Sequence, residues 1–560
     1  VGGCRTWASM VLASIRRPGV SASAAANCGE DEEAPLVESG VSGRVEMVHG
    51  NTVDLKKPIP PKPSQRHPVI GIMSTEDWGK GSFFAETWRM LSMAMPLILL
   101  EATQYLHTVI GLIVVGRLGA VELSVAVLGS AVYSTTGFSI MVGLSSAMET
   151  LCGQAYGAEE YGVLGEVLQR ATLILALVAL PIVWFWWNVG YFLLLAGQHK
   201  EIAGMAAEYV RWLIPGLFGI LVTENCKCFL RSQNVVAPTV WITVASLVAS
   251  PPLFYLMVFH FKFGAKGAAM VSSLLWALES VAFVIYIGYV ARKANRTPGA
   301  PRCWRGFSRN MLHGWGGYIK VAVPSAAMLC LEWWAFEIVV FMGGTLPEPE
   351  LQVAAMGIGF NIIQVSFMAP YGLSQAVSVR VANELGAGNA RGARTAAQVA
   401  IAMAVVSCIL ASLLLLVCRF HVVGIFTSDL QVIHITVKTL LLVALAVAFD
   451  GMNTVMCGVL RGSGRQFLGS LVVSVHYIVG LPISAVGAFH LNMGVVGLWI
   501  GLACATAVEA VGLIWTVHFT DWESQGDLVG AKFSSEGAGR KQVDSPVTSE
   551  GAGWRVEAAR

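Results

Sequence analysis

Two carboxylates stand in a stretch of sequence that is otherwise suited to lipid. The segment CLEWWAFEIVVFMGG, residues 330–344, contains both Glu332 and Glu337. A charged side chain at the centre of a bilayer costs about 2.5–3.5 kcal/mol on insertion scales, so these acids are expected to face protein or a water-filled cavity. Glu337 follows Glu332 by five residues, which is about 140° round an α-helix. The two do not share a helix face, and we expect Glu332 to face a cavity and Glu337 to bond neighbouring helices.

A second acid begins a polar stripe in a later apolar segment. Asp450, Asn453, Thr454 and Cys457 follow at spacings that place them on one side of a helix. A polar stripe on an apolar helix must face protein or water rather than lipid. Because burial disfavours the ionised form of a carboxyl, Glu332 and Asp450 could exchange protons near physiological pH and pair with a cationic substrate. The alternative is a neutral, hydrogen-bonded acid that only ties two helices together.

Five further acids lie at membrane depth in the sequence. Glu149 and Glu224 stand near helix ends, and we interpret them as interfacial charges within reach of water. Glu279 and Glu509 occupy equivalent positions of the repeat described below, which suits a structural role as well as a functional one. Glu101 receives no role.

Other kinds of chemistry have no motif in this sequence. No G-x-x-x-x-G-K-[ST] loop for ATP occurs, and GAGNARG from Gly386 is interpreted as a hairpin between helices. Cys226 and Cys228 lack a nearby His pair, so we interpret them as small apolar helix residues rather than metal ligands. We expect no cofactor, no metal and no enzymatic activity. The net charge of +2 gives no indication of a nucleic-acid partner.

The composition places these acids in a multi-pass membrane protein. The chain of 560 residues is 55% hydrophobic and only 13% charged, whereas soluble proteins carry about 25% charged residues. Apolar stretches of about 20 residues are typical of transmembrane helices, and a soluble core cannot account for so many. The sequence predicts twelve, near 92–115, 121–148, 168–195, 207–230, 237–260, 267–291, 316–343, 353–378, 396–418, 433–459, 467–490 and 495–519.

The twelve segments form two copies of one unit. GLSSAMETLCGQAYGAEE from Gly143 and GLSQAVSVRVANELGAGN from Gly372 align without a gap at an offset of 229. Further matches at an offset of 230 include Leu230–Arg231 with Leu460–Arg461. Because six helices return the chain to its starting side, the halves should be related by a pseudo-two-fold axis along the membrane normal. Some secondary transporters follow this plan, with binding sites near the midplane between the halves.

Basic residues between the segments predict the orientation and the domains. Fifteen Lys and Arg, Lys227, Arg231 and Arg461 among them, fall on the side of the N-terminus and six on the other, so both chain ends are expected in the cytosol. We expect an N-lobe at 86–291, a basic connecting loop at 292–315 and a C-lobe at 316–520. The tails 1–85 and 521–560 are expected to be disordered and cytosolic, although residues 1–29 also resemble a targeting segment.

Four motifs in order resemble those of one transporter family. They are SAMETLCGQAYGA at 146–158, CLEWWAFE at 330–337, VRVANELGAGNA at 379–390 and GVLRGSGRQ at 458–466. Together they look like the signatures of eukaryotic multidrug and toxic compound extrusion (MATE) transporters, above all the plant detoxification proteins. The resemblance covers residues 85–525. It implies an all-α fold of twelve helices in two six-helix lobes around a cavity.

The resemblance also implies a function and site residues. The proton-linked glutamate of the CLEWW motif falls on Glu332, and an aspartate that acts with it in some plant members falls on Asp450. The chain lacks the acid that other branches carry before VGRLG, so no first-helix coupling site is transferred. We expect proton coupling from Glu332 and Asp450, and substrate contacts from Glu332, Trp333, Gln364, Tyr371 and Asn453.

The leading hypothesis is therefore a monomeric, proton-coupled antiporter in the lipid bilayer that exports or sequesters a small organic solute. Its membrane could be the plasma membrane or an endomembrane such as the vacuole, Golgi or late endosome, with a plastid less favoured. A lipid or oligosaccharide flippase on the same superfold is the alternative, but it would need basic residues in its cavity and the segments hold few. A receptor without transport is a third possibility, and the two-lobe repeat weighs against it.

Overall fold

The computed structural model describes residues 83–427 and 429–543. Within them, twelve helical segments are long and apolar enough to cross a membrane, and no strand is found, which confirms the predicted all-α class and segment number. Residues 1–82 of the tail predicted at 1–85 lie outside the described residues, and residues 83–85 already belong to the first helix. Several helices extend beyond the predicted apolar stretches, because their end turns carry polar side chains that hydropathy does not detect.

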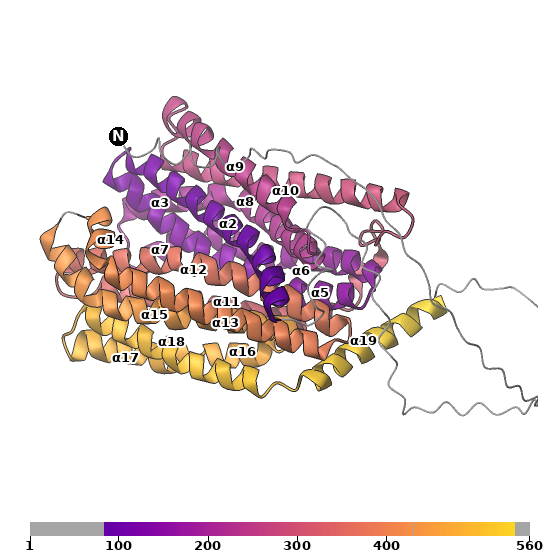
Figure 1. Cartoon of the computed structure of the whole chain (residues 1–560). Helices are drawn as coiled ribbons and strands as arrows, with labels where there is room; N and C mark the ends of the chain where they lie inside the picture. The colour runs from indigo at the N-terminus through magenta and orange to yellow at the C-terminus, as the bar shows by residue number, and fades with distance from the viewer. Residues whose placement is uncertain (1–82, 428, 544–560) are drawn as a thin grey trace, which may run out of the picture. The chain divides into compact units, whose positions relative to one another are not determined.

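The first half of the chain supplies six spans. They are built by α2 (Phe83–Gly116); α3 (Ala120–Tyr133), η3 (Ser134–Phe138), α4 (Ser139–Ser145) and α5 (Ala147–Gly157); α6 (Tyr161–Trp187); α8 (Lys200–Ser232); α9 (Ala237–Tyr255) with η4 (Leu256–His260); and α10 (Ala265–Arg296). A short helix, α7 (Val189–Leu195), lies between the third and fourth spans (Figure 1).

The second half repeats this order after a connecting segment with a 3₁₀ turn, η5 (Arg309–Leu312). Its spans are α11 (Trp315–Gly343); α12 (Pro349–Gly386); α13 (Ala390–Val417); α15 (Leu430–Ser463); α16 (Gln466–Val473), η6 (His476–Gly480), α17 (Leu481–Ala485) and η7 (Val486–His490); and α18 (Val495–His518). The short helix α14 (Arg419–Phe426) corresponds to α7 in the first half.

The predicted repeat extends to the details of one turn. In both halves a π-helical segment leads into the sixth span through a glycine with positive φ, 62° at Gly264 and 57° at Gly494. The backbone N–H that follows each glycine donates to a side chain of the second span of its own half. Ala265 donates to Glu122 Oε2 at 2.9 Å and Val495 to Gln352 Oε1 at 3.0 Å. The two acceptors are related by the same offset as the two glycines. The two units therefore share this hydrogen bond as well as their helix order.

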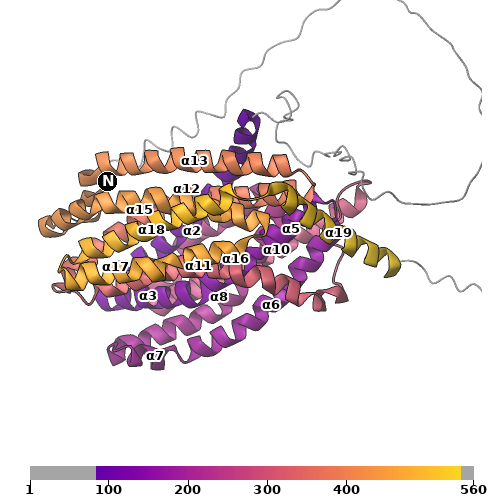
Figure 2. The ribbon, with the colours of Figure 1, turned by 90° about the horizontal axis from the view of Figure 1, so that it is seen from below.

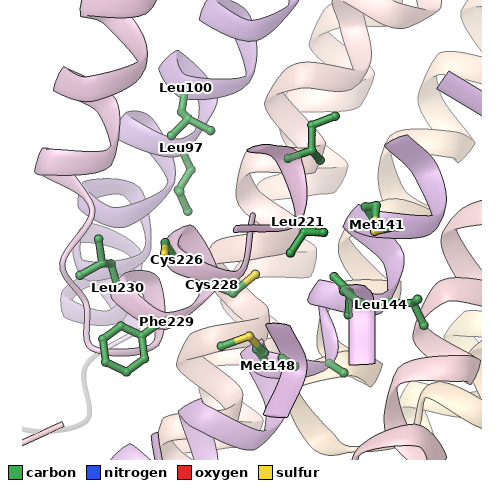
Figure 3. Packing of buried hydrophobic residues seen from close by; sticks show 14 of the residues in the cluster. Leu97, Leu100, Met141, Leu144, Met148, Leu221, Cys226, Cys228, Phe229 and Leu230 are labelled. Carbon is green, nitrogen blue, oxygen red and sulfur yellow. The ribbon is translucent and has the colours of Figure 1, made fainter. Parts of the chain in front are cut away.

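Apolar side chains fill the space between the helices of the first half. Figure 3 shows Cys226 and Cys228 of α8 among Leu97, Leu100 and other apolar residues of this core. Both cysteines are buried and free, as the interpretation of them as small apolar helix residues predicts. Among the described residues, no group of three His, Cys, Asp or Glu side chains is placed to hold a metal ion.

The expectation of disorder after residue 521 was wrong for its first part, which forms α19 (Trp522–Val543). This helix lies at the same end of the bundle as α5 (Figures 1 and 2) and contacts α12 and α13. Val529 and Phe533 are buried, so the helix is stabilised by packing. The polar composition of the segment concealed these two apolar anchors.

Candidate functional site

A cavity of about 540 Å³ opens between the two halves of the chain. Its wall includes residues of α2, α3, α8, α9 and α10 from the first half and of α11, α12 and α15 from the second. The lining positions on α2 and α11 belong to the second half of each helix, from Glu101 to Val115 and from Glu332 to Val340. The cavity therefore extends from the middle of the spans toward the end opposite to the start of α2.

Acidic side chains dominate the charge of the cavity wall. Glu101, Glu224, Glu279, Glu332, Glu337 and Asp450 all line it, and no Lys or Arg of the described chain does. A cleft of one charge sign with low-dielectric walls concentrates ions of the opposite sign. The arrangement can attract a cation or a proton, and it is unsuited to a phosphate.

The structure brings together the two acids predicted to couple to protons. Glu332 and Asp450 are 5% and 3% exposed, and their carboxyls lie within hydrogen-bond reach of each other. Two carboxyls can form a hydrogen bond only if one of them carries a proton, because ionised carboxylates only accept. Glu332 Oε1 and Asp450 Oδ1 have no hydrogen-bond partner among the described residues. The pair can thus share, gain and release protons at the cavity wall.

Behind this pair lies a third acid, for which the sequence left a structural and a functional role open. Glu509 of α18 is fully buried and interacts electrostatically with Asp450 and Glu332. It accepts a hydrogen bond from Asn453 Nδ2 at 3.1 Å and lies 3.5 Å from His476 Nδ1. Glu509 does not line the cavity, so it can influence the pair but cannot contact a solute.

Four of the five predicted substrate contacts lie on the cavity wall, namely Glu332, Trp333, Gln364 and Tyr371. Trp333 stacks on Phe138 of the first half, with ring centroids 6.2 Å apart. Phe367 stacks on Tyr371 at 5.2 Å. These rings form an apolar wall beside the acids, suited to the flat apolar body of a small organic molecule.

Two expectations about the acid-bearing helices were wrong. Asn453 does not line the cavity, because its amide donates to Thr506 O at 2.9 Å and to Glu509, so the polar stripe of α15 also faces α18. Glu337 does not face away from the cavity but lines it on the same helix as Glu332. The cavity borders a wide arc of α11, so two acids about 140° apart can both reach it.

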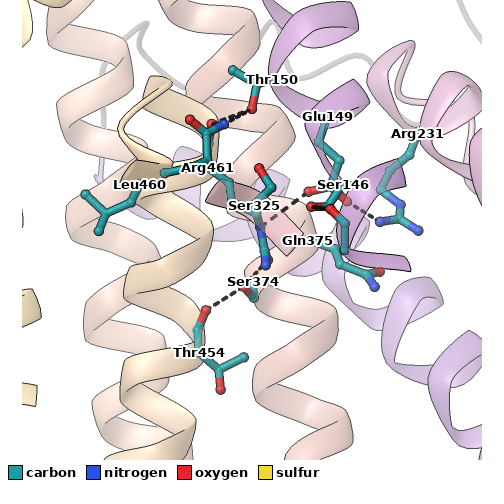
Figure 4. A network of polar contacts seen from close by, with 12 residues as sticks. Ser146, Glu149, Thr150, Arg231, Ser325, Ser374, Gln375, Thr454, Leu460 and Arg461 are labelled. Atoms are coloured by element: carbon teal, nitrogen blue, oxygen red, sulfur yellow. Dashed lines mark hydrogen bonds and ion pairs between the residues drawn. The ribbon is translucent and has the colours of Figure 1, made fainter. Parts of the chain in front are cut away.

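The opposite end of the spans is closed by a cluster of buried charges, in which one ion pair joins the two halves (Figure 4). Glu149 of α5 is 2% exposed and lies 2.5 Å from Arg231 and 3.8 Å from Arg461 of the second half. Arg461 also donates to Ser374 at 2.8 Å. The expectation that Glu149 is an interfacial charge in contact with water was therefore wrong, because α5 is covered by helices of both halves.

Backbone contact reinforces this closure at two equivalent glycines. A Cβ placed on Gly157 of α5 would lie 2.0 Å from Asn383 O, and one on Gly386 of α12 would lie 2.1 Å from Gln154 O. Gly157 and Gly386 are equivalent positions of the repeat, and so are Gln154 and Asn383. Each half therefore contacts the other through the same two positions.

Side-chain amides repeat this reciprocity. Gln154 donates to Gly462 O at 3.5 Å, and Asn383 donates to Ser232 O at 3.4 Å. The two acceptors are also equivalent in the repeat, so the pseudo-two-fold axis passes through this contact. We name Gln154, Gly157, Asn383 and Gly386 the reciprocal seam. It holds the halves together at one end while the cavity separates them at the other.

Comparison with known proteins assigns the chain to a family. The MatE family model matches residues 96–256 and again residues 324–486, one match in each half. The chain belongs to the MatE family. It is similar to Protein DETOXIFICATION 16 of Arabidopsis thaliana, with 36% identity over 448 residues, 80% of this chain and 90% of the relative. Protein DETOXIFICATION 12 of the same plant is 34% identical over 455 residues, 80% of this chain and 92% of the relative.

Solved structures agree with this assignment. The crystal structure of the eukaryotic MATE transporter AtDTX14 matches with a TM-score of 0.76 and 33% identity, covering 80% of this chain and 99% of that one. A Vibrio cholerae MATE transporter, VcmN, shares the fold at 18% identity with a TM-score of 0.68, covering 79% and 99% of the two chains. The relatives and neighbours are transporters, so this MatE protein is a multi-pass membrane transporter rather than an enzyme.

Sequence reasoning missed the first-half wall of the transporter's cavity. Glu101, Glu224 and Glu279 all line it. Glu224 is not an interfacial charge as expected, because it is buried and pairs with Lys227 Nζ at 2.8 Å. Lys227, Arg231 and Arg461 were counted as loop residues, but all three are buried inside helices. The sequence did contain a signal for this pair, because a lysine three residues after a glutamate on a helix can form an ion pair with it.

Proposed function

We propose that the transporter exports a small organic solute in exchange for protons by alternating access. The observation that carries the proposal is the approach of the Glu332 and Asp450 carboxyls in the wall of a cavity between the halves. A carboxyl pair of this kind changes its charge when one proton enters or leaves. The charge of the cavity, and with it the attraction for a solute, then depends on proton supply.

We further propose that both chain ends face the cytosol. Removing the three buried basic residues from the fifteen counted on that side leaves twelve against six on the other, so the excess persists. In this orientation the cavity opens away from the cytosol, and the reciprocal seam closes the cytosolic end. The conformation described is then the one that releases solute and takes up protons.

The cycle has two half-reactions. On the outer side a proton binds to the Glu332–Asp450 pair, lowers the negative charge of the cavity and weakens the binding of the solute. The lobes, residues 86–291 and 316–520, then rock until the seam parts and the cavity opens to the cytosol. The proton leaves there, and the next solute binds to the recharged wall. The cycle needs no cofactor beyond the proton as coupling ion, and one chain forms the whole cavity, which supports a monomeric transporter.

The wall also informs the choice between solute classes. Its acids and stacked aromatic rings suit organic cations and flat, weakly charged metabolites, xenobiotics or hormones. A flippase would need basic groups for a lipid phosphate, and no Lys or Arg of the described residues lines the cavity. For the membrane we propose the plasma membrane or an endomembrane, where a proton gradient is available.

Transport in proteoliposomes tests the proposal. The purified transporter is reconstituted with a pH dye in the lumen, and gradients of an organic cation, a flavonoid and an organic acid are imposed in turn. A solute gradient should drive a lumenal pH change, and Glu332→Gln should abolish it. Glu208→Gln is the matched control, because Glu208 forms an exposed ion pair with Lys266. Normal transport by Glu332→Gln with unchanged pH dependence would overturn the mechanism.

A further inference from the structure

Both halves place buried or partly buried acids on the same three helices of the six-helix unit. The first, fourth and sixth spans carry Glu101, Glu224 and Glu279 in the first half and Glu332, Asp450 and Glu509 in the second. Only Glu279 and Glu509 are strictly equivalent in the repeat. In the second half, Glu332 and Asp450 form the proposed proton pair, and Glu509 lies behind them. Those of the first half have no role in that mechanism.

The first-half acids are exposed to the cavity rather than sealed behind it. All three line it, whereas Glu509 in the second half does not. Glu279 is only 8% exposed, and its Oε2 has no hydrogen-bond partner among the described residues. Glu101 accepts a hydrogen bond from Gln375 Nε2 at 2.9 Å, while Gln375 Oε1 is also without a partner in the described chain. Two acceptors on the cavity wall are thus unsatisfied, and burial makes an unsatisfied acceptor costly.

Lys227 is the basic residue that interacts with all three acids, whereas Arg231 interacts with Glu101 and Glu224 but is paired with Glu149 at 2.5 Å. Lys227 is 1% exposed and interacts electrostatically with Glu101, Glu224 and Glu279. Its ammonium contacts only Glu224 at hydrogen-bond distance and lies 5.4 Å from the centre of the Trp276 ring. The repeat counterpart of Lys227 is the neutral Cys457. The Lys227 ammonium pairs with Glu224 and the Arg231 guanidinium with Glu149, so Glu101 and Glu279 are left to attract a cation from the cavity.

We propose that Glu101, Glu224 and Glu279, together with the face of Trp276, form a second cation site that binds the ammonium group of a transported solute. The proposal rests on the proposed transport function and deepens it, because solute charge and proton are then held by opposite halves of one cavity. Trp276 lines the cavity beside Glu279, and an indole face is the preferred aromatic partner of an organic cation. Lys227 neutralises part of the site and thereby limits its affinity.

Equilibrium binding of ethidium, a fluorescent aromatic cation, tests the site in the full-length transporter in nanodiscs. Glu279→Gln and Glu101→Gln remove a negative charge at almost constant shape, and each should raise the Kd for ethidium at least tenfold, about 1.4 kcal/mol. Lys227→Met should lower the Kd several-fold, a direction that a folding defect cannot produce. Glu208→Gln changes an acid in an exposed ion pair outside the cavity, and it should leave the Kd for ethidium within twofold of the wild-type value.

Each other result overturns the proposal. A Kd for ethidium within twofold of the wild-type value in both Gln variants would show that these acids do not form the site. An equal loss for a neutral probe of similar size assigns the acids a structural role only. Displacement of ethidium by Na⁺ or K⁺, but not by choline at the same concentration, assigns the site to an inorganic ion. A failure of the proton mechanism appears elsewhere, as unchanged proton coupling in Glu332→Gln, and leaves the ethidium results intact.

Discussion

The reciprocal seam predicts that a single methyl group can shift the conformational balance of the transporter. In Gly386→Ala the new Cβ would stand 2.1 Å from Gln154 O, and in Gly157→Ala it would stand 2.0 Å from Asn383 O. An ordinary contact needs at least 3.4 Å, so the ends of α5 and α12 must separate by more than one ångström. The obstacle is backbone on both sides, and it cannot be relieved by a rotamer change.

This separation has an energetic consequence that can be bounded. Overpacking of this kind costs about 1–3 kcal/mol, and the conformation in which the seam is parted avoids the cost. The population ratio of the two conformations should therefore shift roughly 5- to 150-fold toward the parted one. The double variant should add much less than the sum of the two, because the first methyl group already moves the helices apart.

Distance measurements between spin labels at Glu159 and Ala387 provide the assay. Both positions are exposed and flank the seam, one on each half. Gly386→Ala should increase the population with the longer separation and slow the net transport cycle. Gly288→Ala is the matched control, because Gly288 lies inside α10 and a Cβ there meets nothing within 4 Å. An unchanged distance distribution in both seam variants would refute the assignment of the seam as the closed gate.

Three further predictions follow from contacts near the same end of the bundle. Arg380 of α12 bonds Glu86 of α2 at 2.9 and 3.1 Å, so Arg380→Met should cost about 3–5 kcal/mol by removing the hydrogen-bonded cation of a buried carboxylate. Adding Glu86→Gln should recover part of this loss, measured by thermal unfolding in detergent. Phe533→Ser together with Val529→Ser should release α19 from α12 and α13, which limited proteolysis would detect as cleavage after residue 521. Burial raises the pKa of the Cys303 thiol to about 12, whereas an unfolded thiol ionises near a pKa of about 8.5. Its contribution to stability is complete below about pH 8.5 and is lost as pH rises toward about 12, and Cys303→Ala should flatten that part of a stability profile.

The fold was predictable because its signals are long and redundant. Twelve apolar stretches and a nearly constant offset do not depend on any single residue, and both were confirmed. Glu332 and Asp450 could each be predicted to avoid lipid because each lies deep in a span, and the resemblance to the family implied that the two act together. Their common location on the cavity wall follows from the helix order.

The errors arose where the partner of a residue decides its environment. Glu149 and Arg231 were each interpreted as water-exposed, yet they satisfy each other at 2.5 Å inside the bundle. Distance along the chain to a helix end could not reveal this pair, because α5 and α8 both continue past their apolar stretches. Asn453 was misassigned for a related reason, since a polar stripe does not reveal which neighbouring helix it faces.

The reciprocal seam has a consequence for how the two copies can diverge in evolution. Gly157 and Gly386 each contact the opposite copy, so a larger residue in either one is felt by both, and neither can be exchanged independently. Lys227 and its repeat counterpart Cys457 are not part of the seam, and there the copies already differ. A duplicated transporter can in this way keep one shared contact surface while its halves specialise, and the acids proposed to bind solute and proton do lie in different halves.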